Sequence, residues 1–301
     1  MSLLVTGSIG IDTVESPHGK VVDVLGGSAV YFSFAASLFS PVRLVAVVGD
    51  DFPTDFRKTM ESRGVDLAGL ETRAGSQTFR WHGRYVGDMG EAETVEVDLN
   101  VLAEDAPTVP AGFRDSKFVF LANTHPSLQR QLLKNISDPQ LVVCDTMNLW
   151  IVEERDSLLE TLRCVHGVII NDGEAKLLTD AHNMVVAGEK ILEWGPKFVI
   201  IKKGANGAIM VSREGVDCLP AFPTKDVKDP TGAGDSFAGG FLGYVASQGS
   251  FDRATLRKAM ARGTVTASFA VEDFSLNRLR SLSQDELNGR IARYAEMLQV
   301  E

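Results

Sequence analysis

The chain is poor in cysteine, in tryptophan and tyrosine, and in basic residues. Its three cysteines, Cys144, Cys164 and Cys218, lie far apart and form no Cys-x-x-Cys pair. This spacing argues against a disulfide framework and against a cysteine-rich metal site. It favours reduced thiols and a cytoplasmic location.

Long apolar runs and an excess of positive charge are also missing. No segment reaches roughly 18 uninterrupted apolar residues, so no membrane-spanning segment is expected. The opening stretch, MSLLVTGSIGID, lacks the cationic start of a signal peptide. Because the net charge is −10 and no long lysine or arginine run is present, nucleic acid is not expected as a partner.

What is present is an ordinary globular composition, with 44% hydrophobic and 23% charged residues over 301 positions. This length fits one large α/β domain with an appendage, or two small domains. Short β-branched runs alternate with helical patterns, which predicts crossover units and a mainly parallel sheet with helices on both faces, a three-layer α/β/α fold. Strands are expected at 3–6, 43–48, 118–122, 141–145, 167–170, 198–202 and 207–211, and helices at 29–39, 51–63, 126–135, 153–164, 173–179, 185–194, 236–247 and 252–271. Ligands of such sheets bind beyond the carboxyl ends of the strands.

Two segments depart from this alternation. Residues 76–100 alternate in polarity and are rich in aromatic residues and threonine, which predicts antiparallel strands joined by turns at Gly83, Gly87 and Gly90. Residues 12–27 have a similar pattern. We expect a small β-sheet lid from 12–27 and 73–100, beside a large domain formed by 1–11, 28–72 and 101–301. The alternative is a pair of ordinary surface hairpins.

The stretch DPTGAGDSFAGGFLGY, from Asp229 to Tyr244, carries the strongest chemical signal. Its glycines let main-chain N–H groups approach a ligand at the start of a helix, where unpaired donors and the helix dipole favour an anion. Asp235 follows at once, and an ordinary aspartate is already ionised at neutral pH and able to accept a proton from a hydroxyl. The alternative is a glycine-rich turn with an N-capping aspartate.

This stretch resembles the C-terminal signature of the ribokinase-like, or PfkB, family of carbohydrate kinases. The resemblance implies an anion hole for the transferred phosphoryl group at Gly232, Ala233 and Gly234, and a catalytic base at Asp235. It also implies that Asp229 and Thr231 lie beside the nucleotide and, in many members, a monovalent-cation site.

Four further stretches resemble the family in the same order, so the resemblance covers nearly the whole chain. VTGSIGID ends in a substrate-binding aspartate, here Asp12. VLGGSAVYFSFAASLF contains the Gly-Gly pair, Gly26 and Gly27, which lets substrate approach the backbone. IINDGEAKLL matches the Asn-x-x-Glu motif that places Mg²⁺ and phosphates, here Asn171 and Glu174, although these two residues also fit a helix capping box.

The stretch IIKKGANGAIMV resembles the strand–turn–strand beneath the nucleotide. Gly204 and Gly207 would make room there, and Lys202 or Lys203 would face phosphates. A hairpin turn explains the two glycines equally well.

Departures from the family pattern leave the substrate open. Tyr31 stands where many relatives carry a sugar-binding Asn, and Lys202 stands where many have Thr. Tyr31, Phe79 and Trp81 could stack on a nucleobase or belong to the core of the lid. Asn123, at the end of an expected strand, is a candidate substrate contact, with a structural hydrogen-bonding role as the alternative.

The resemblance implies transfer of a phosphoryl group from Mg²⁺·ATP, with K⁺ as an additional cation in some members, to a hydroxyl of a sugar or ribonucleoside. The aromatic lid tilts the expectation toward a nucleoside. The alternatives are a kinase of a free sugar or sugar acid, and a nucleotide-binding sensor without turnover. The partner is expected to be a small molecule, and the protein a monomer or a homodimer formed through the lid.

Overall fold

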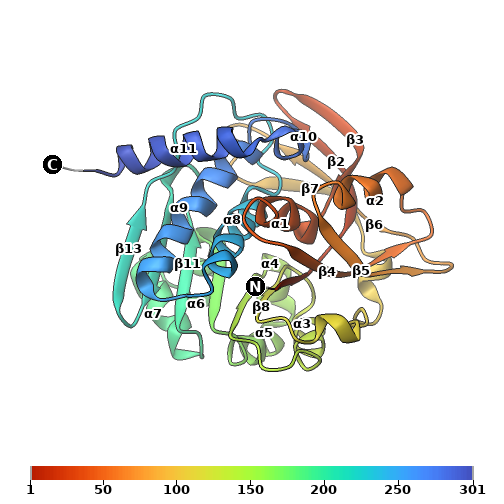
Figure 1. Ribbon diagram of the computed structural model, residues 1–301, viewed down its shortest axis with the longest axis horizontal. Helices are drawn as coiled ribbons and strands as arrows, with labels where there is room; N and C mark the ends of the chain where they lie inside the picture. Colours follow the sequence, from red (N-terminus) through yellow and green to blue (C-terminus); the bar gives the residue numbers. More distant parts are fainter. Residues whose placement is uncertain (1, 300–301) are drawn as a thin grey trace.

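A nine-stranded sheet forms the centre of the protein, which the computed structural model describes over residues 2–299 (Figure 1). The strand order is β13-β12-β11-β10-β9-β8-β1-β4-β5. Neighbours from β11 to β5 pair in parallel, whereas the hairpins at β12 and β13 are antiparallel. The strands are β1 (Leu3–Thr6), β4 (Val42–Gly49), β5 (Val65–Arg73), β8 (Phe118–Leu121), β9 (Leu141–Cys144), β10 (Gly167–Asn171), β11 (Phe198–Lys202), β12 (Ala208–Ser212) and β13 (Gly215–Leu219).

Helices cover both faces of this sheet because its strands are apolar on both sides. In β1, Leu3 and Val5 belong to one buried cluster and Leu4 to the other. The alternation follows from the period of two in a strand, and it gives the three layers expected from the sequence. One layer contains α1 (Ser28–Ala36), α8 (Ala233–Gln248), α9 (Arg253–Ala270), α10 (Asn277–Ser281) and α11 (Gln284–Met297), and the other contains α3 (Pro126–Leu133), α5 (Arg155–Leu162), α6 (Asp172–Thr179) and α7 (Met184–Glu193).

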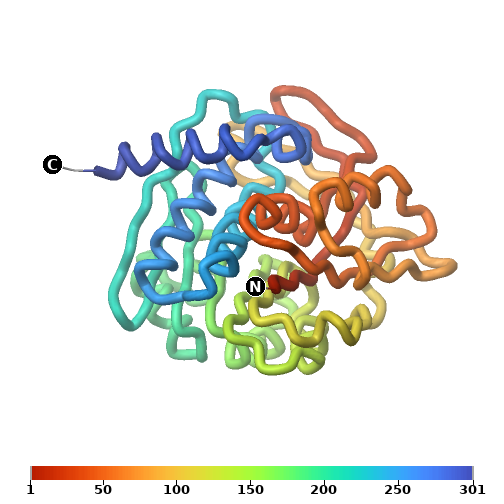
Figure 2. The backbone as a smooth tube through the Cα atoms, in the orientation of Figure 1, coloured from red at the N-terminus to blue at the C-terminus, as the bar shows by residue number. Residues whose placement is uncertain are grey.

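The remaining helical segments contribute at most one buried residue each. They are α2 (Thr54–Glu61), α4 (Asn148–Glu153) and the 3₁₀ turns η1 (Asn100–Ala103), η2 (Ala111–Phe113) and η3 (Gly204–Asn206). Figure 2 shows the chain entering at the middle of the molecule with β1 and leaving at its periphery after α11. None of the helices within residues 2–299 has the length and hydropathy to cross a bilayer.

A second sheet of four strands, in the order β3-β2-β6-β7, unites the two segments that break the helix–strand alternation. Its strands are β2 (Gly10–Ser16), β3 (Gly19–Gly26), β6 (Phe79–Tyr85) and β7 (Ala92–Asp98). One small sheet from two insertions is therefore confirmed. The turn predicted at Gly83 is wrong, because Gly83 lies inside β6, where the ring of Trp81 occupies the space that a Cβ at Gly83 would need.

Several elements differ from the sequence prediction. The single helix expected at 153–164 begins earlier and is broken at Glu154, which ends α4 and precedes α5. The strands β5 and β13 and the helices α10 and α11 were not predicted. β5 was missed because only Val65 and Gly69 of its nine residues are fully buried, so it lacks a continuous apolar run.

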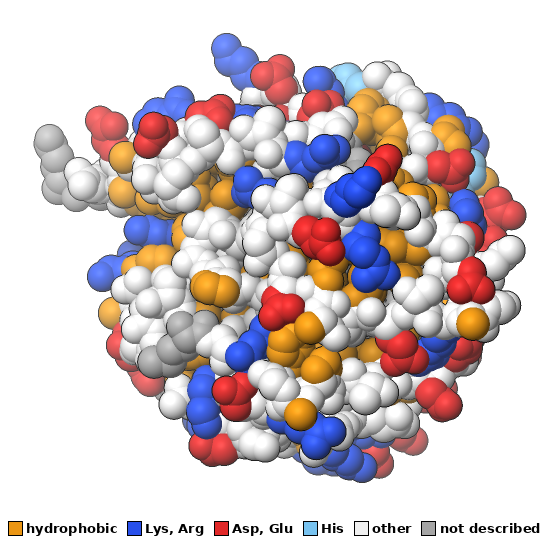
Figure 3. Space-filling model, turned by 45° about the vertical axis from the view of Figure 1, so that its right-hand side comes forward, with side chains coloured by type: hydrophobic (Ala, Val, Ile, Leu, Met, Phe, Trp, Pro, Cys, Tyr) orange, Lys and Arg blue, Asp and Glu red, His pale blue; other side chains and the backbone are white. Residues whose placement is uncertain are grey.

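The surface beside the lid carries mixed charge. Figure 3 shows basic and acidic side chains interspersed over the face that it draws, with no continuous basic area on that face. Several charges on and beside the lid are paired, for example Arg80 with Asp23 and Asp51, and Glu15 with Lys20 and Arg84.

Candidate active site

The carboxyl ends of three neighbouring strands bring polar residues together. Asp145 follows β9, Asn171 ends β10 and Lys202 ends β11, and Asn171 and Lys202 are register partners. The start of α8 lies beside these strand ends. The side-chain amine of Lys202 is 2.7 Å from the position that a Cβ of Gly234 would occupy. The site therefore forms at the edge of the sheet where ligands of parallel α/β folds bind.

Steric contacts explain why glycine occupies positions 232 and 234 at the start of α8. Gly232 precedes the helix with φ 71°, in the left-handed region. A Cβ at Gly232 would also lie 2.2 Å from the ring of Tyr31, and a Cβ at Gly234 would meet Lys202. Of the three amides expected to hold an anion, that of Ala233 donates to the carbonyl of Pro230 at 3.1 Å. The first turn of α8 still offers N–H groups without partners inside the helix, at its positive dipole end.

Four ionisable groups form a partly or wholly buried cluster beside this helix start: Asp145, Glu174, Lys202 and Asp235. Burial, and then repulsion from Asp145, raises the pKa of Asp235 to about 7, although Lys202 opposes the shift. The same two causes raise the pKa of Glu174 to about 8. For Lys202 burial acts in the opposite sense, but the three carboxylates outweigh it and raise the pKa of the amine.

This environment corrects one expectation from the sequence. Asp235 was expected to have an ordinary aspartate pKa, but in the folded protein its pKa lies near neutrality, chiefly because the carboxyl group is buried and secondly because Asp145 repels its charge. Additional positive charge near the cluster would favour the ionised form of Asp235. The cluster therefore has the electrostatics of a site that receives a cation together with an anionic ligand.

Asp12 lies at the other end of the site, on β2 of the lid. It is 3% exposed, and its Oδ1 has no hydrogen-bond partner within the described residues. Burial and the nearby Asp229 and Asp235 raise the pKa of Asp12 to about 7. Because a buried oxygen without a partner is costly, Asp12 is suited to accept a hydrogen bond from a ligand hydroxyl.

The glycine pair Gly26 and Gly27 is explained by contacts within the protein. A Cβ at Gly26 would lie 1.8 Å from Oδ2 of Asp12, and a Cβ at Gly27 would lie 2.5 Å from the carbonyl oxygen of Ser8. Gly27 also has φ 100°. The pair therefore makes room for the carboxylate of Asp12 and for the turn after β1. The approach of substrate to this backbone, which the resemblance implied, stays a prediction.

Asp229 holds the glycine loop in place. This fully buried carboxylate accepts the N–H of Thr231 at 2.9 Å and the N–H of Ser275 at 3.0 Å. The hydroxyl of Ser275 in turn donates to the carbonyl of Leu25 on β3. Thr231 Oγ1 donates to the hydroxyl of Tyr85, on β6, at 3.2 Å. The glycine loop is therefore tied to two strands of the lid, and neither Tyr85 nor Ser275 was singled out in the sequence.

Asn171 and Glu174 form the capping box of α6. The side chain of Asn171 accepts the N–H of Glu174, and the side chain of Glu174 accepts the N–H of Asn171, each at 2.7 Å. Only one carboxylate oxygen of Glu174 is used in this way. The structural alternative is thus present, and one oxygen of Glu174 remains for a cation.

The turn between β11 and β12 contains Gly204 and Gly207, which have φ 52° and 84°. A Cβ at Gly207 would lie 2.0 Å from the carbonyl of Leu219, whereas nothing lies within 4 Å of one at Gly204. Because β11 and β12 are antiparallel, the hairpin alone accounts for Gly207. The open space beside Gly204 leaves room for a ligand at the end of β11.

Two residues expected to contact substrate have side chains packed or hydrogen-bonded within the protein. Tyr31 is 1% exposed and belongs to the core beside Gly232, so no free ring face remains to stack on a base. Asn123 accepts a hydrogen bond from Trp150 at 2.9 Å and donates to Met147 at 3.0 Å. For Asn123 the structural alternative fits these contacts better, since they link the end of β8 to α4.

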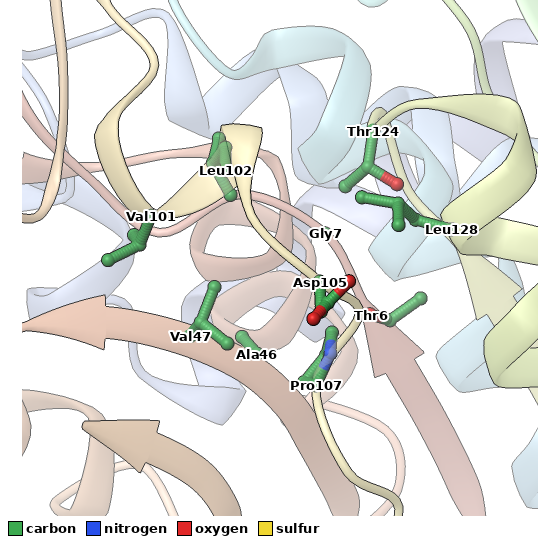
Figure 4. Close-up of a pocket in the computed structure, with 10 residues that line it drawn as sticks. All are labelled: Thr6, Gly7, Ala46, Val47, Val101, Leu102, Asp105, Pro107, Thr124 and Leu128. Atoms are coloured by element: carbon green, nitrogen blue, oxygen red, sulfur yellow. The ribbon is translucent and has the colours of Figure 1, made fainter. Parts of the chain in front are cut away.

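Next to β1, the same edge of the sheet retains a small cavity of about 20 Å³ (Figure 4). Val101 and Leu102 of η1 line one side, and Thr124 and Leu128 the other. Its volume suffices for about one water molecule. It is therefore too small to be the acceptor site.

Comparison with known proteins identifies the family. The model of the "pfkB family carbohydrate kinase" matches residues 11–280. The chain belongs to this family. Members transfer a phosphoryl group to a hydroxyl of a sugar or nucleoside, so the protein is a phosphotransferase with an alcohol group as acceptor.

Two curated relatives align over most of the chain. A cytidine kinase of Thermococcus kodakarensis is 31% identical over 81% of this chain and 88% of its own length. An ATP-dependent ribose-1-phosphate kinase of Halopiger xanaduensis is 29% identical over 80% of each chain. The pfkB kinase described here is thus a nucleoside or sugar kinase of the ribokinase type.

A solved structure supports the fold independently. The aminoimidazole riboside kinase of Salmonella enterica, complexed with aminoimidazole riboside and an ATP analog, superposes with a TM-score of 0.78. The alignment covers 97% of this chain and all of that chain, at 20% identity. The predicted ribokinase-like fold, with a mainly parallel sheet and a smaller sheet beside it, is confirmed.

Proposed function

We propose that this kinase phosphorylates a hydroxyl of a ribonucleoside with ATP, with Asp235 as the base. The register of β2 and β6 is the observation that supports a nucleoside as the acceptor. Asp12 pairs with Trp81 across these strands, so both side chains project from the same face of the lid. An aromatic ring beside the sugar-binding carboxylate suits an acceptor made of a sugar and a base.

The contacts of Trp81 support this role. Its ring covers Gly83 and its Nε1 donates to Thr94 at 3.2 Å, so the ring is held in place while the side chain stays partly exposed. Phe79 covers Gly10 on the same face. A fixed aromatic ring stacks on any base and contributes about 1–3 kcal/mol. Trp81 and Phe79 therefore replace Tyr31 as the proposed base contacts.

The relative that acts on ribose 1-phosphate provides the second candidate. A phosphorylated acceptor needs cations facing it. By the alternation of β6, Arg80, His82 and Arg84 project from the face opposite Trp81, and they pair with Asp23, Asp51 and Glu15. The face of β6 that carries Trp81 therefore presents an aromatic ring and no cationic side chain. This favours a nucleoside over ribose 1-phosphate as the acceptor.

The donor end fits ATP and Mg²⁺. No group of three or more His, Cys, Asp or Glu side chains suited to a metal ion occurs within residues 2–299. This suits Mg²⁺, which keeps several waters and binds through one or two carboxylates and the nucleotide phosphates. The free oxygen of Glu174, directly or through water near Asn171, would hold it. Bound there, Mg²⁺ would neutralise charge on the phosphates.

The protein's own groups account for the remaining chemistry. Asp12 orients the sugar, and Asp235 takes the proton of the attacking hydroxyl. Lys202 and the first N–H groups of α8 stabilise charge on the transferred group. Asp229, Thr231 and Tyr85 hold the lid against the glycine loop and so exclude water from the transfer.

An assay of ADP formation over a panel of acceptors tests the proposal. The panel contains cytidine, uridine, adenosine, inosine, ribose and ribose 1-phosphate, and Asp235→Asn controls for contaminating kinases. We expect at least one nucleoside to exceed ribose and ribose 1-phosphate in kcat/KM by about tenfold or more, equivalent to the contribution of one stacked base. A preference for ribose 1-phosphate would overturn it, and bound ATP without turnover on any acceptor would indicate a sensor.

We also propose that the protein is a monomer. One of the two edge strands of the lid, β7, is exposed and carries Glu93, Glu96 and Asp98. Pairing two copies of this edge would bring like charges together, a common device against edge-to-edge association. Light scattering after gel filtration measures the mass, and a dimer abolished by mutations in β7 would contradict this proposal.

A further inference from the structure

A cavity of about 160 Å³ lies at the amino edge of the central sheet, away from the candidate active site. Its walls include Leu141 and Phe198, the first residues of β9 and β11, and His166, which precedes β10. These strands run from the cavity toward Asp145, Asn171 and Lys202. Four to five strand residues, about 15 Å, therefore separate the cavity from the polar cluster.

The inner part of the cavity is apolar. Phe198, Met210 and Leu256 are buried there, and Phe251 is half-buried. An apolar cavity of roughly 150 Å³ in another protein is large enough to bind benzene. The space beside β11 is therefore suited to one six-membered ring.

Two hydrogen-bond donors line one wall. The N–H of Val142 donates to Nδ1 of His166 at 3.0 Å, so in the neutral ring the proton sits on Nε2. Burial and the charge of Lys197 lower the pKa of His166, which keeps the ring neutral. The amine of Lys197 makes no hydrogen bond or ion pair with any part of the chain from 2 to 299. Both groups are available to a carboxylate.

Two further lining residues limit the charge of a ligand. Arg253 is already engaged, since its Nε donates to Asp217 at 2.8 Å and its Nη1 to the carbonyl of Glu214 at 2.6 Å. The exposed carboxylate of Glu214 also lines the cavity. It would repel a second negative charge, and sites for drug-sized ligands occupy about 300 Å³ or more. Nucleotides and polyphosphates are therefore poor candidates.

We propose that this cavity is a binding site for a small aromatic monocarboxylate, with the ring against Phe198, Met210 and Leu256 and the carboxylate held by Lys197 and His166. The site shares no residue with the candidate active site. The proposal therefore stands independently of the nucleoside specificity proposed above.

Titration with benzoate, followed by nuclear magnetic resonance of ¹³C-labelled histidines, tests the proposal on the full chain. The sequence has five histidines, so the signals are few enough to assign by substitution. We expect saturable binding with a dissociation constant of about 1 mM or tighter, centred on His166. The bound carboxylate should raise the pKa of His166, because it stabilises the imidazolium.

Charge variants should change the affinity for benzoate in opposite directions. Lys197→Met should weaken benzoate binding about tenfold, whereas Glu214→Gln should strengthen it by about two- to fivefold, because one removes attraction and the other removes repulsion. Lys134→Met, an equal charge change on the exposed end of α3, should leave binding unchanged. Benzamide and acetate should each bind at least about tenfold more weakly than benzoate.

Three results would overturn the proposal. The first is the absence of saturable shifts at His166 with benzoate at about 10 mM, tenfold above the expected dissociation constant. The second is equal binding to the Lys197→Met and Lys134→Met variants. The third is equal affinity for benzamide and benzoate, which would assign the cavity to neutral aromatic molecules instead.

Discussion

The same strands form the carboxyl edge and the amino edge of the central sheet, but the charged groups at these two edges are arranged differently. At the carboxyl edge, Asp145, Glu174 and Asp235 share one lysine, and their pKa values are raised. At the amino edge, Arg253 is paired with Asp217 and the ring of His166 is held neutral. Buried carboxylates without sufficient positive charge destabilise a fold. This destabilisation occurs at the carboxyl edge, where a ligand is expected to bring the missing positive charge.

The comparison also separates two uses of glycine. At the carboxyl edge Gly232 combines a left-handed backbone with contact to Tyr31. Gly64, after α2, has nearly the same φ, 72°, but nothing lies within 4 Å of its Cβ position. The first glycine shapes the site, whereas the second only allows the chain to turn.

The largest expected effect comes from removing the proposed base at the carboxyl edge. Asp235→Asn should lower turnover by about 10²–10⁴-fold and leave ATP affinity nearly unchanged, because the amide keeps the shape and cannot accept the proton. Turnover is measured by ADP release and ATP affinity by calorimetry. Asp226→Asn, at an exposed position, is the control. A near-normal rate in Asp235→Asn would exclude this residue as the base.

The next effect comes from filling the space at Gly232. Gly232→Ala should lower stability by about 2–4 kcal/mol, the sum of backbone strain at positive φ and overpacking against Tyr31. Displacement of the glycine loop should also lower turnover by about tenfold or more. Gly64→Ala has the same backbone strain alone and should cost about 1 kcal/mol with normal turnover. Equal losses in urea unfolding of the two variants would show that the contact with Tyr31 is unimportant.

A pH-dependent effect follows from Asp12. Its pKa is raised to about 7 in the folded protein, above the value of about 3.9 for a free aspartate. The stability that the protonated form supplies is therefore present below about pH 4 and lost as the pH rises through about 7. Asp12→Asn cannot ionise, so it should stabilise the ligand-free protein by about 1–3 kcal/mol at pH 8, and by less at pH 5.

Chemical unfolding at the two pH values measures this difference. Asp226→Asn should change stability equally at both. If Asp12→Asn were destabilising at pH 8, the carboxylate would have a partner in the folded protein, and its role as a free acceptor for a substrate hydroxyl would be lost.

The smallest expected effect concerns the contact between lid and loop. Tyr85→Phe removes the hydrogen bond from Thr231, worth about 0.5–1.5 kcal/mol, and should raise KM for the acceptor by about two- to tenfold. Turnover should change little. Tyr244→Phe, on α8, serves as the matched control. An unchanged KM in steady-state kinetics would indicate that the lid closes without this contact.

Sequence patterns predicted the fold because its signals are local. Apolar runs such as Phe198–Lys202 predicted strands, and the stretch Asp229–Tyr244 predicted the start of α8. Tyr85 and Ser275 gave no such signal, since their importance depends on partners 146 and 46 residues away. For Tyr31 the sequence left base stacking and a core position open, because only the packed structure places its ring against Gly232.

The sequence by itself determined the class of fold, the family, and the positions of the glycine loop and its aspartate. These depend on periodicity and on contiguous motifs, which survive without knowledge of distant contacts. Only the tertiary structure decided the ionisation of Asp12 and Asp235 and the face on which Trp81 lies. A pKa depends on every charge within several ångströms, and the face of a strand depends on its register with its neighbours.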